Sequence, residues 1–407
     1  PALRLISVGR IARKMFVRSI LAAAIAASAY SAAVPAPAGS AAPSLAPAAA
    51  GAPRPALRLK GGQAEIGDDT KIAVFSKKDR LSMTLSDFMR ERCIEKPDDK
   101  DAREMECIMN GVQAACRLIA DMVGKAGIQD MTGLAGTGEN VQGEEQKKLD
   151  ILSNDVFKDK LAKTGCMAYL GSEEEDEAIH IAGKHGGNYV AVFDPLDGSS
   201  NIDAAISVGT IFGIYKAEGS KSFPLVKGEK QVAAGYCMYS TCSILMVSLG
   251  DGVNGFTLDS SLGEFVLTHP NVQMPKRGKI YSTNQGNLPQ WSSGIKEYFD
   301  TVTNGKGESG QKYSLRYIGS MVGDMHRTLL YGGIFMYPAD DKNKDGKLRL
   351  LYEANPMAML AEQAGGKAST GTEDVMKVAP RKLHDRVPIY IGSSEDVDEC
   401  LKYVNKK

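Results

Sequence analysis

The sequence predicts an α/β fold with two subdomains, and three observations support this prediction. Helical patterns come first, over residues 85–95, 102–125 and 144–163. Short apolar segments separated by turn residues follow to about residue 267, and strand and helix patterns then mix to the end of the chain. After an N-terminal segment of different composition, about 340 residues remain, which is enough for two layered subdomains around a large interior.

The third helical pattern carries the first acidic pair of interest. The pattern before it, over 102–125, is amphipathic, and Gly127 is a suitable C-cap for it. Asp150 and Asp155 lie five residues apart, a spacing that does not place them on one helical face. Both side chains can reach one site only if the helix ends or is overridden between them.

Three later apolar runs end at acidic residues, as strands do when their carboxyl ends form a site. The clearest run, 189–193, is β-branched and aromatic and predicts a buried strand. The other two runs cover 166–170 and 348–352. The acidic residues that follow the three runs are Glu173 and Glu174, Asp194 and Asp197, and Glu353.

The segment 194–203 has the composition of a metal and phosphate site. Carboxylate oxygens suit a hard divalent cation such as Mg²⁺. Gly198 permits close backbone approach, and the N–H groups of Gly198, Ser199 and Ser200 can point at an anion if a helical turn begins there. For this segment alone, a solvated Asx-type turn is an equally good interpretation. The other acidic clusters favour the interpretation of this segment as a metal and phosphate site.

At this point several motifs together carry a resemblance. They are Lys-Leu-Asp-Ile-Leu-Ser-Asn-Asp (148–155), Ser-Glu-Glu (172–174), Asp-Pro-Leu-Asp-Gly-Ser-Ser-Asn-Ile-Asp (194–203), Arg-Tyr-Ile-Gly-Ser-Met-Val (316–322), His-Arg-Thr-Leu-Leu-Tyr-Gly-Gly-Ile-Phe-Met-Tyr-Pro (326–338) and Gly-Lys-Leu-Arg-Leu-Leu-Tyr-Glu (346–353). Over residues 81–402 the chain resembles the fructose-1,6-bisphosphatases, within the lithium-sensitive, metal-dependent phosphatase superfamily that also contains inositol monophosphatases. The resemblance implies a layered α-β-α-β-α sandwich with a metal and phosphate subdomain over 80–275 and a sugar-phosphate subdomain over 276–407.

The resemblance also implies the roles of individual residues. The metal ligands would be Glu173, Glu174, Asp194, the Leu196 carbonyl, Asp197 and Glu353. The carboxylates that position and deprotonate the attacking water would be Asp155 and Glu174, supported by Asp150. The 1-phosphate would lie against Asp197, Gly198, Ser199 and Ser200, and the sugar and its 6-phosphate against Asn284, Tyr317, Met321, Tyr337, Lys347 and Arg316 of a neighbouring subunit in a homotetramer. The implied cofactor is Mg²⁺, two or more ions per subunit, with Mn²⁺ as a substitute.

Three functions remain open on this basis. The first is hydrolysis of the 1-phosphate of fructose 1,6-bisphosphate, in gluconeogenesis or the Calvin cycle. The second is a sedoheptulose-1,7-bisphosphatase or an enzyme that uses both sugars, although Arg316, Met321 and Tyr337 favour the six-carbon sugar. The third is a sugar-phosphate sensor or scaffold, which would be expected to lose a ligand, and none is lost. Metal-assisted phosphate hydrolysis needs no His nucleophile, and His326 is expected to be structural.

The N-terminal segment and the charge balance bear on location and partners. Residues 1–64 hold eight Lys or Arg and no Asp or Glu, and resemble a cleaved signal and transit peptide. This two-part order is similar to that of nucleus-encoded proteins of algal plastids bounded by extra membranes. The predicted location is therefore the chloroplast stroma, and a cytoplasmic enzyme with a retained tail is the alternative. The remaining chain is mildly acidic without a basic patch, which argues against a nucleic-acid or membrane partner.

Overall fold

A computed structural model describes residues 83–129, 131–139, 145–183, 186–220 and 222–406. The predicted leader over 1–64 lies outside these residues. Among the helices of the described segments, none combines the length and the hydrophobicity that crossing a bilayer requires.

Three helices form the first layer of the fold. They are α2 (Leu85–Glu95), α3 (Lys100–Lys125) and α4 (Lys148–Ala162). Thr84 and Asp87 form a capping box at the start of α2, which has the predicted bounds. The prediction for α4 was wrong at its start, because residues 145–147 form the strand β2 (Glu145–Lys147), antiparallel to β1 (Leu134–Glu139).

An 8-stranded sheet forms the second layer, in the order β10-β9-β8-β7-β6-β5-β3-β4. Its pairs are antiparallel except for β3 and β5, which run parallel. The strands are β3 (Met167–Ser172), β4 (Ile179–His180), β5 (Tyr189–Asp197), β6 (Val208–Lys216), β7 (Gln231–Tyr239), β8 (Ser243–Ser248), β9 (Val253–Asp259) and β10 (Glu264–His269).

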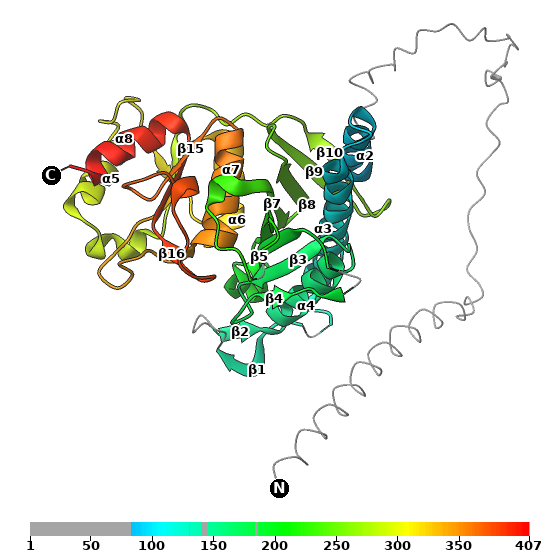
Figure 1. The fold of residues 1–407 in the computed structure, drawn as a ribbon. Helices are drawn as coiled ribbons and strands as arrows, with labels where there is room; N and C mark the ends of the chain where they lie inside the picture. The colour runs from blue at the N-terminus through cyan, green and yellow to red at the C-terminus, as the bar shows by residue number, and fades with distance from the viewer. Residues whose placement is uncertain (1–82, 130, 140–144, 184–185, 221, 407) are drawn as a thin grey trace, which may run out of the picture. The chain divides into compact units, whose positions relative to one another are not determined.

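A 5-stranded sheet in the order β12-β11-β13-β17-β15 forms the fourth layer. It contains β11 (Ile280–Ser282), β12 (Ser314–Leu315), β13 (Ile334–Tyr337), β15 (Lys367–Ser369) and β17 (Ile389–Gly392). Helices α6 (Met321–Tyr331) and α7 (Asn355–Gln363) lie between the two sheets, and α5 (Ser293–Thr303) and α8 (Ser394–Val404) cover the outer face (Figure 1). The predicted α-β-α-β-α layering is confirmed.

Short elements complete the described fold. A 2-stranded sheet joins β14 (Leu348–Arg349) and β16 (Arg386–Val387). The short helices are η5 (Ser199–Ala204), η6 (Gly228–Lys230), η7 (Gln285–Gln290), η8 (Leu350–Ala354) and η9 (Val375–Lys377).

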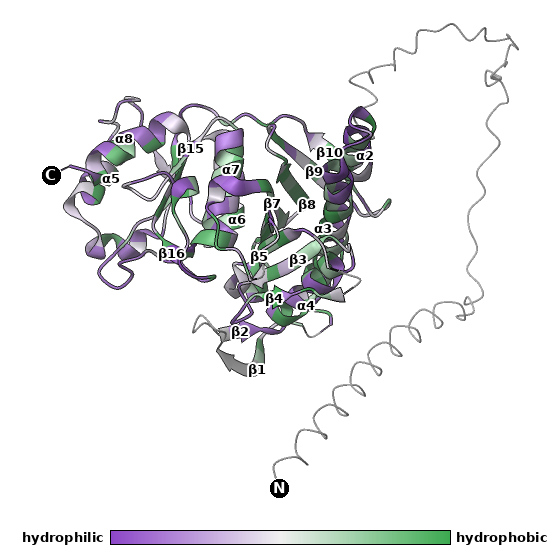
Figure 2. Cartoon of the chain, viewed as in Figure 1, coloured by the Kyte–Doolittle hydropathy of each residue, from purple (hydrophilic) through white to green (hydrophobic). Residues whose placement is uncertain are grey.

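The apolar side chains gather between the layers. On β6, Phe212 faces the α2–α4 layer whereas its neighbour Ile211 faces the α6 and α7 layer, as the two-residue period of a strand requires. Tyr298 and Val397 fill the space between the second sheet and its outer helices. In Figure 2 the interior strands β7 and β8 are mainly hydrophobic. This packing holds the ends of β3 and β5 against the middle helical layer, where the acidic residues lie.

Candidate active site

The parallel pair β3 and β5 brings two predicted acidic clusters to one edge of the large sheet. Both strands end at that edge because parallel neighbours run in the same direction. Glu173 follows β3 directly, and its N–H donates to the Phe193 carbonyl of β5 at 3.1 Å. Asp194 and Asp197 lie at the end of β5, and all three carboxylates are buried.

A bulge at the end of β5 sets the directions of its two aspartates. Asp194 pairs with Ile211 of β6, and Asp197 pairs with Gly209, so two intervening residues on β5 oppose one on β6. Asp194 Oδ1 accepts the Leu196 N–H at 2.9 Å. The bulge keeps Asp194 and Asp197 at one site, although they are three residues apart.

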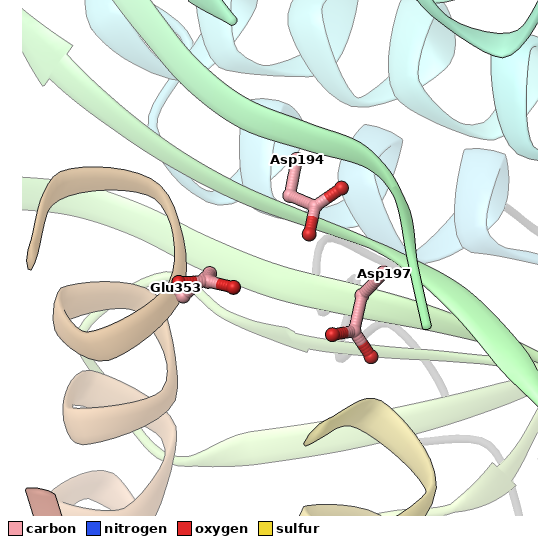
Figure 3. A group of neighbouring side chains, drawn as sticks. All are labelled: Asp194, Asp197 and Glu353. Carbon is pink, nitrogen blue, oxygen red and sulfur yellow. The ribbon is translucent and has the colours of Figure 1, made fainter. Parts of the chain in front are cut away.

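Glu353 reaches the same site from the second half of the chain. The predicted strand over 348–352 was wrong beyond Arg349, because a π-helical turn, η8, begins at Leu350 and leads into α7. This turn directs Glu353 towards Asp194 and Asp197 (Figure 3). One carboxylate oxygen of each of the three residues lies within 4.8 Å of the others.

The start of α6 holds Asp197 in place. Asp197 Oδ2 accepts hydrogen bonds from Ser320 Oγ at 2.7 Å and from the Val322 N–H at 3.0 Å. Gly198 has φ 75°, and a Cβ atom there would lie 2.7 Å from the Ser320 Cβ atom. A side chain at position 198 would therefore push α6 away from the turn.

A buried arginine balances part of the acidic charge. Arg349 lies 2.7 Å from Glu173 Oε1 and 3.5 Å from Glu353 Oε1. Its backbone N–H also donates to Glu353. These contacts orient both glutamates from one side.

Burial disfavours the ionised form of these carboxylates when no cation is bound. It raises the pKa of Glu173 to about 8 and the pKa of Asp197 to about 7, and it raises the pKa of Asp194 well above its usual range. Neighbouring carboxylates add to the shifts of Glu173 and Asp194 through like-charge repulsion. The donors are all oxygen atoms, so the residues present fit a hard divalent cation such as Mg²⁺.

Asp150 lies beside this cluster at the start of α4. Its carboxylate accepts the Lys147 N–H at 2.7 Å, and burial raises its pKa to about 7 despite this bond. Glu174 is half-buried, and Gln146 Nε2 donates to it at 2.5 Å.

A cavity of about 490 Å³ joins the acidic cluster to residues of the second subdomain. The predicted site residues that line it are Asp150, Glu173, Glu174, Asp194, Leu196, Asp197, Gly198, Ser199, Ser200, Tyr317, Met321, Tyr337, Lys347 and Glu353. The Lys347 ammonium lies 6.0 Å from the centre of the Tyr337 ring. The cavity thus has acidic residues on one side and Lys347 with two tyrosines on the other.

Three predicted residues do not line this cavity. Asp155 lies away from the cavity in this structure: α4 continues past it, its side chain is 66% exposed, and it pairs with Lys158 at 3.1 Å. Asn284 instead caps η7 by accepting the Gly286 N–H. Arg316 is exposed and donates to the Leu315 carbonyl of its own subunit at 2.7 Å.

The sequence interpretation missed several residues that line the cavity. They are Lys147, Gly319, Ser320, Asp324, Phe335, Leu348 and Arg349. Ser320 and Arg349 lie inside motifs that carry the family resemblance, so those motifs could have identified them as site residues. Their contacts with Asp197 and Glu173 depend on segments more than a hundred residues apart and have no local signature.

Comparisons with known proteins identify the family of the chain. Residues 83–270 match the family model "Fructose-1-6-bisphosphatase, N-terminal domain", and residues 274–405 match "Fructose-1-6-bisphosphatase, C-terminal domain". The chain belongs to the fructose-1,6-bisphosphatase family. The resemblance read from the motifs is thereby confirmed.

Individual members of the fructose-1,6-bisphosphatase family are similar over most of their length. The chain is 46% identical over 366 residues to the chloroplastic enzyme of Brassica napus, covering 86% of this chain and 88% of that protein. It is 49% identical over 322 residues to the cytosolic enzyme of the same plant, covering 78% and 94%. The holo Leishmania major fructose-1,6-bisphosphatase structure has a TM-score of 0.74 at 42% identity, covering 80% of this chain and 99% of that one.

Proposed function

We propose that the protein hydrolyses the 1-phosphate of fructose 1,6-bisphosphate in a reaction that depends on Mg²⁺. The observation that carries this proposal is the convergence of the Asp194, Asp197 and Glu353 carboxylates within 4.8 Å beside a cavity lined by Lys347. Metal ions held by the acidic centre would bind one phosphate of the substrate, and Lys347 would bind the phosphate at the other end. Membership of the fructose-1,6-bisphosphatase family supports the same substrate.

The metal would be held by Glu173, Glu174, Asp194, the Leu196 carbonyl, Asp197 and Glu353. When bound, Mg²⁺ would polarise the phosphoryl oxygens and stabilise the leaving alkoxide, and Mn²⁺ could replace it. The backbone N–H groups of Gly198, Ser199 and Ser200 would bind the 1-phosphate. Arg349 would orient Glu173 and Glu353 through its contacts with both.

Asp150 and Glu174 are the residues that we assign to activating the attacking water. The pKa of Asp150, about 7, lies close to a neutral working pH, where a general base is most effective. Both side chains line the cavity, whereas Asp155 does not. The role first assigned to Asp155 therefore passes to Asp150.

The sugar and the 6-phosphate would lie against Tyr317, Met321, Tyr337 and Lys347. We assign Arg316 to the site of a neighbouring subunit, because its guanidinium is exposed and outside its own cavity. This assignment requires a neighbouring subunit, and the homotetramer implied by the family resemblance would supply it.

A plastid location is part of the proposal, since relatives named chloroplastic are 46% identical and residues 1–64 are basic and acid-free. Cytosolic relatives are equally similar, so the cytoplasm is the alternative. N-terminal sequencing of the native protein should find a start between about 60 and 80 if the leader is cleaved.

Phosphate release by protein lacking residues 1–64 tests the activity. Fructose 1,6-bisphosphate, sedoheptulose 1,7-bisphosphate and inositol monophosphate would be compared with Mg²⁺ and with a chelator, and Asp197→Asn would serve as the control. We expect preference for the first substrate, lost with the chelator and in Asp197→Asn. Preference for the seven-carbon sugar would keep the metal site and reject the sugar assignment, and binding without turnover would indicate a sensor.

A further inference from the structure

The bulge that carries the Leu196 carbonyl contains a proline, which weakens the sheet at that point. Pro195 has no N–H, and the two bulge residues face the single residue Thr210 of β6. The Pro195 carbonyl therefore needs a partner other than the regular strand ladder. The partner is the Thr210 side chain, whose hydroxyl donates to the Pro195 carbonyl at 2.9 Å.

A second hydroxyl fixes the direction of this bond. Tyr239 Oη on β7 lies 2.8 Å from Thr210 Oγ1. A threonine hydroxyl has one hydrogen, and that of Thr210 is donated to Pro195, so the Tyr239 hydroxyl donates to Thr210. Both side chains are buried, with exposed fractions of 0% for Thr210 and 3% for Tyr239.

The surroundings of these hydroxyls are mainly apolar, although the thiols of Cys116 and Cys237 also lie beside the Tyr239 hydroxyl. Val208 and Phe212, which share the face of Thr210 on β6, belong to the cluster between this sheet and the first helical layer, as does Tyr239. A hydroxyl pair in such a cluster is retained at a cost unless each group is hydrogen-bonded. Among the described residues, this hydroxyl pair contacts one oxygen of the metal-binding turn, the Pro195 carbonyl.

The peptide unit between Pro195 and Leu196 is consequently held at both ends. Its carbonyl accepts the Thr210 hydroxyl, and its N–H donates to Asp194 Oδ1 at 2.9 Å. Rotation of this peptide plane would break both bonds. The orientation of this plane determines where the next carbonyl, that of Leu196, points. Because the Leu196 N–H is bonded to one oxygen of Asp194, the other oxygen is the one that would bind a cation.

We propose that Thr210, supported by Tyr239, is a positioning residue that orients Asp194 and the Leu196 carbonyl for divalent metal binding. This inference rests on the proposed function, because it takes the acidic cluster as the metal site. Thr210 touches neither substrate nor metal. Its effect on the reaction passes through the geometry of the bulge.

Metal binding by the purified protein tests the role of Thr210. Titration calorimetry with Mn²⁺ or Mg²⁺ alone would be combined with phosphate release at varied Mg²⁺. Thr210→Val keeps the shape and removes the hydroxyl, so we expect metal binding to weaken at least about tenfold, as for other residues that orient metal ligands. The KM for fructose 1,6-bisphosphate at saturating Mg²⁺ should stay within about twofold, because the sugar pocket is untouched.

Three further variants separate positioning from loss of packing. Thr210→Ser retains the hydroxyl and should restore most of the metal affinity. Tyr239→Phe should weaken metal binding to a smaller extent, since it leaves the bond from Thr210 to Pro195 in place. Tyr236→Phe is the matched control: this buried phenol on β7 is bonded to His326 at 2.8 Å and should leave metal affinity unchanged.

The outcomes distinguish this inference from the proposed function. Wild-type metal affinity in a folded Thr210→Val variant overturns the inference and leaves the function intact. If Thr210→Val does not fold, unchanged affinity in Tyr239→Phe overturns it. Absence of both metal binding and phosphate release in the wild-type protein would instead reject the proposed function.

Discussion

At the scale of single residues, helical phase decides which acidic side chain of one motif faces the acidic cluster. Asp150 and Asp155 are five residues apart on α4, and each residue of an α-helix turns by about 100°. The two side chains therefore point roughly 140° apart. Asp150 is buried beside the acidic cluster, whereas Asp155 faces solvent.

Replacement of these two aspartates should affect kcat very differently. Asp150→Asn should lower kcat by about 10²- to 10⁴-fold, because it removes a general base. Asp155→Asn should change kcat by less than about threefold, since an exposed ion pair contributes little. Phosphate release at saturating Mg²⁺ and substrate measures both, and similar losses in the two variants would contradict the assignment.

A buried histidine makes stability depend on pH away from the site. Burial lowers the pKa of His326 to about 4, with a smaller contribution from His269. The unfolded chain then binds more protons than the folded protein between about pH 4 and 6.5, so the contribution of His326 is fully present above pH 6.5 and is lost as pH falls. The loss between pH 7 and pH 4 should be on the order of 2–3 kcal/mol.

The matched variant for this test is His326→Gln, which keeps a hydrogen-bonding group for Tyr236 but does not titrate. Urea unfolding of both proteins at pH 7 and pH 4 gives the two free energies of unfolding. We expect the wild-type protein to lose more stability than the variant over this range. Equal losses would show that His326 does not remain neutral when the protein is folded.

At the scale of secondary structure, the sequence predicted elements whose signals are local. The helix over 85–95 has the predicted bounds because its apolar pattern and the Thr84 cap lie within a few residues. The strand that begins at Tyr189 was also predicted, although it continues to Asp197 and does not end before Asp194. The start of α4, the bulge opposite Thr210 and the turn η8 were not, because each depends on strand pairing or packing with distant segments.

Two glycines in α3 offer a paired test of helix packing. A Cβ atom at Gly124 would meet nothing within 4 Å, so Gly124→Ala should stabilise the protein by up to about 1 kcal/mol through helix propensity. A Cβ atom at Gly111 would lie 2.6 Å from Thr164 Cγ2 and 3.3 Å from the Lys160 carbonyl oxygen. Gly111→Ala should therefore destabilise it by roughly 1–3 kcal/mol.

Urea unfolding measures both effects, and phosphate release should remain near the wild-type value in both variants because neither glycine lines the cavity. Stabilisation in both variants would indicate that the contact between α3 and the end of α4 is loose, and destabilisation in both would contradict the open space at Gly124.

At the scale of the whole molecule, the site exists only because two sheets meet around α6 and α7. Glu173, Asp194 and Asp197 come from the large sheet, and Tyr337 and Lys347 come from the second subdomain. Local periodicity could identify each acidic cluster but could not place it beside Lys347. The motif resemblance supplied that step, and it also implied that Arg316 reaches the site from a neighbouring subunit.

Mixed oligomers can decide whether Arg316 completes the site of a neighbour. Arg316→Ala should raise the KM for fructose 1,6-bisphosphate at least about tenfold, since a hydrogen bond to a charged phosphate contributes about 1.5–3 kcal/mol. Asp197→Asn should be nearly inactive. When the two are coexpressed with different tags and purified as hybrids, an Arg316→Ala subunit retains its acidic cluster and receives Arg316 from its Asp197→Asn neighbour.

Activity at low substrate in these hybrids should therefore exceed the sum of the two parents. The control pairs Lys347→Ala with Asp197→Asn: Lys347 lines the cavity of its own subunit, so no neighbour can replace it and no gain is expected. Additive activity in the Arg316 hybrids would place the Arg316 side chain outside every active site. A gain in both hybrids would instead show that hybrid formation itself raises activity, and it would not support a role for Arg316 in a neighbouring site.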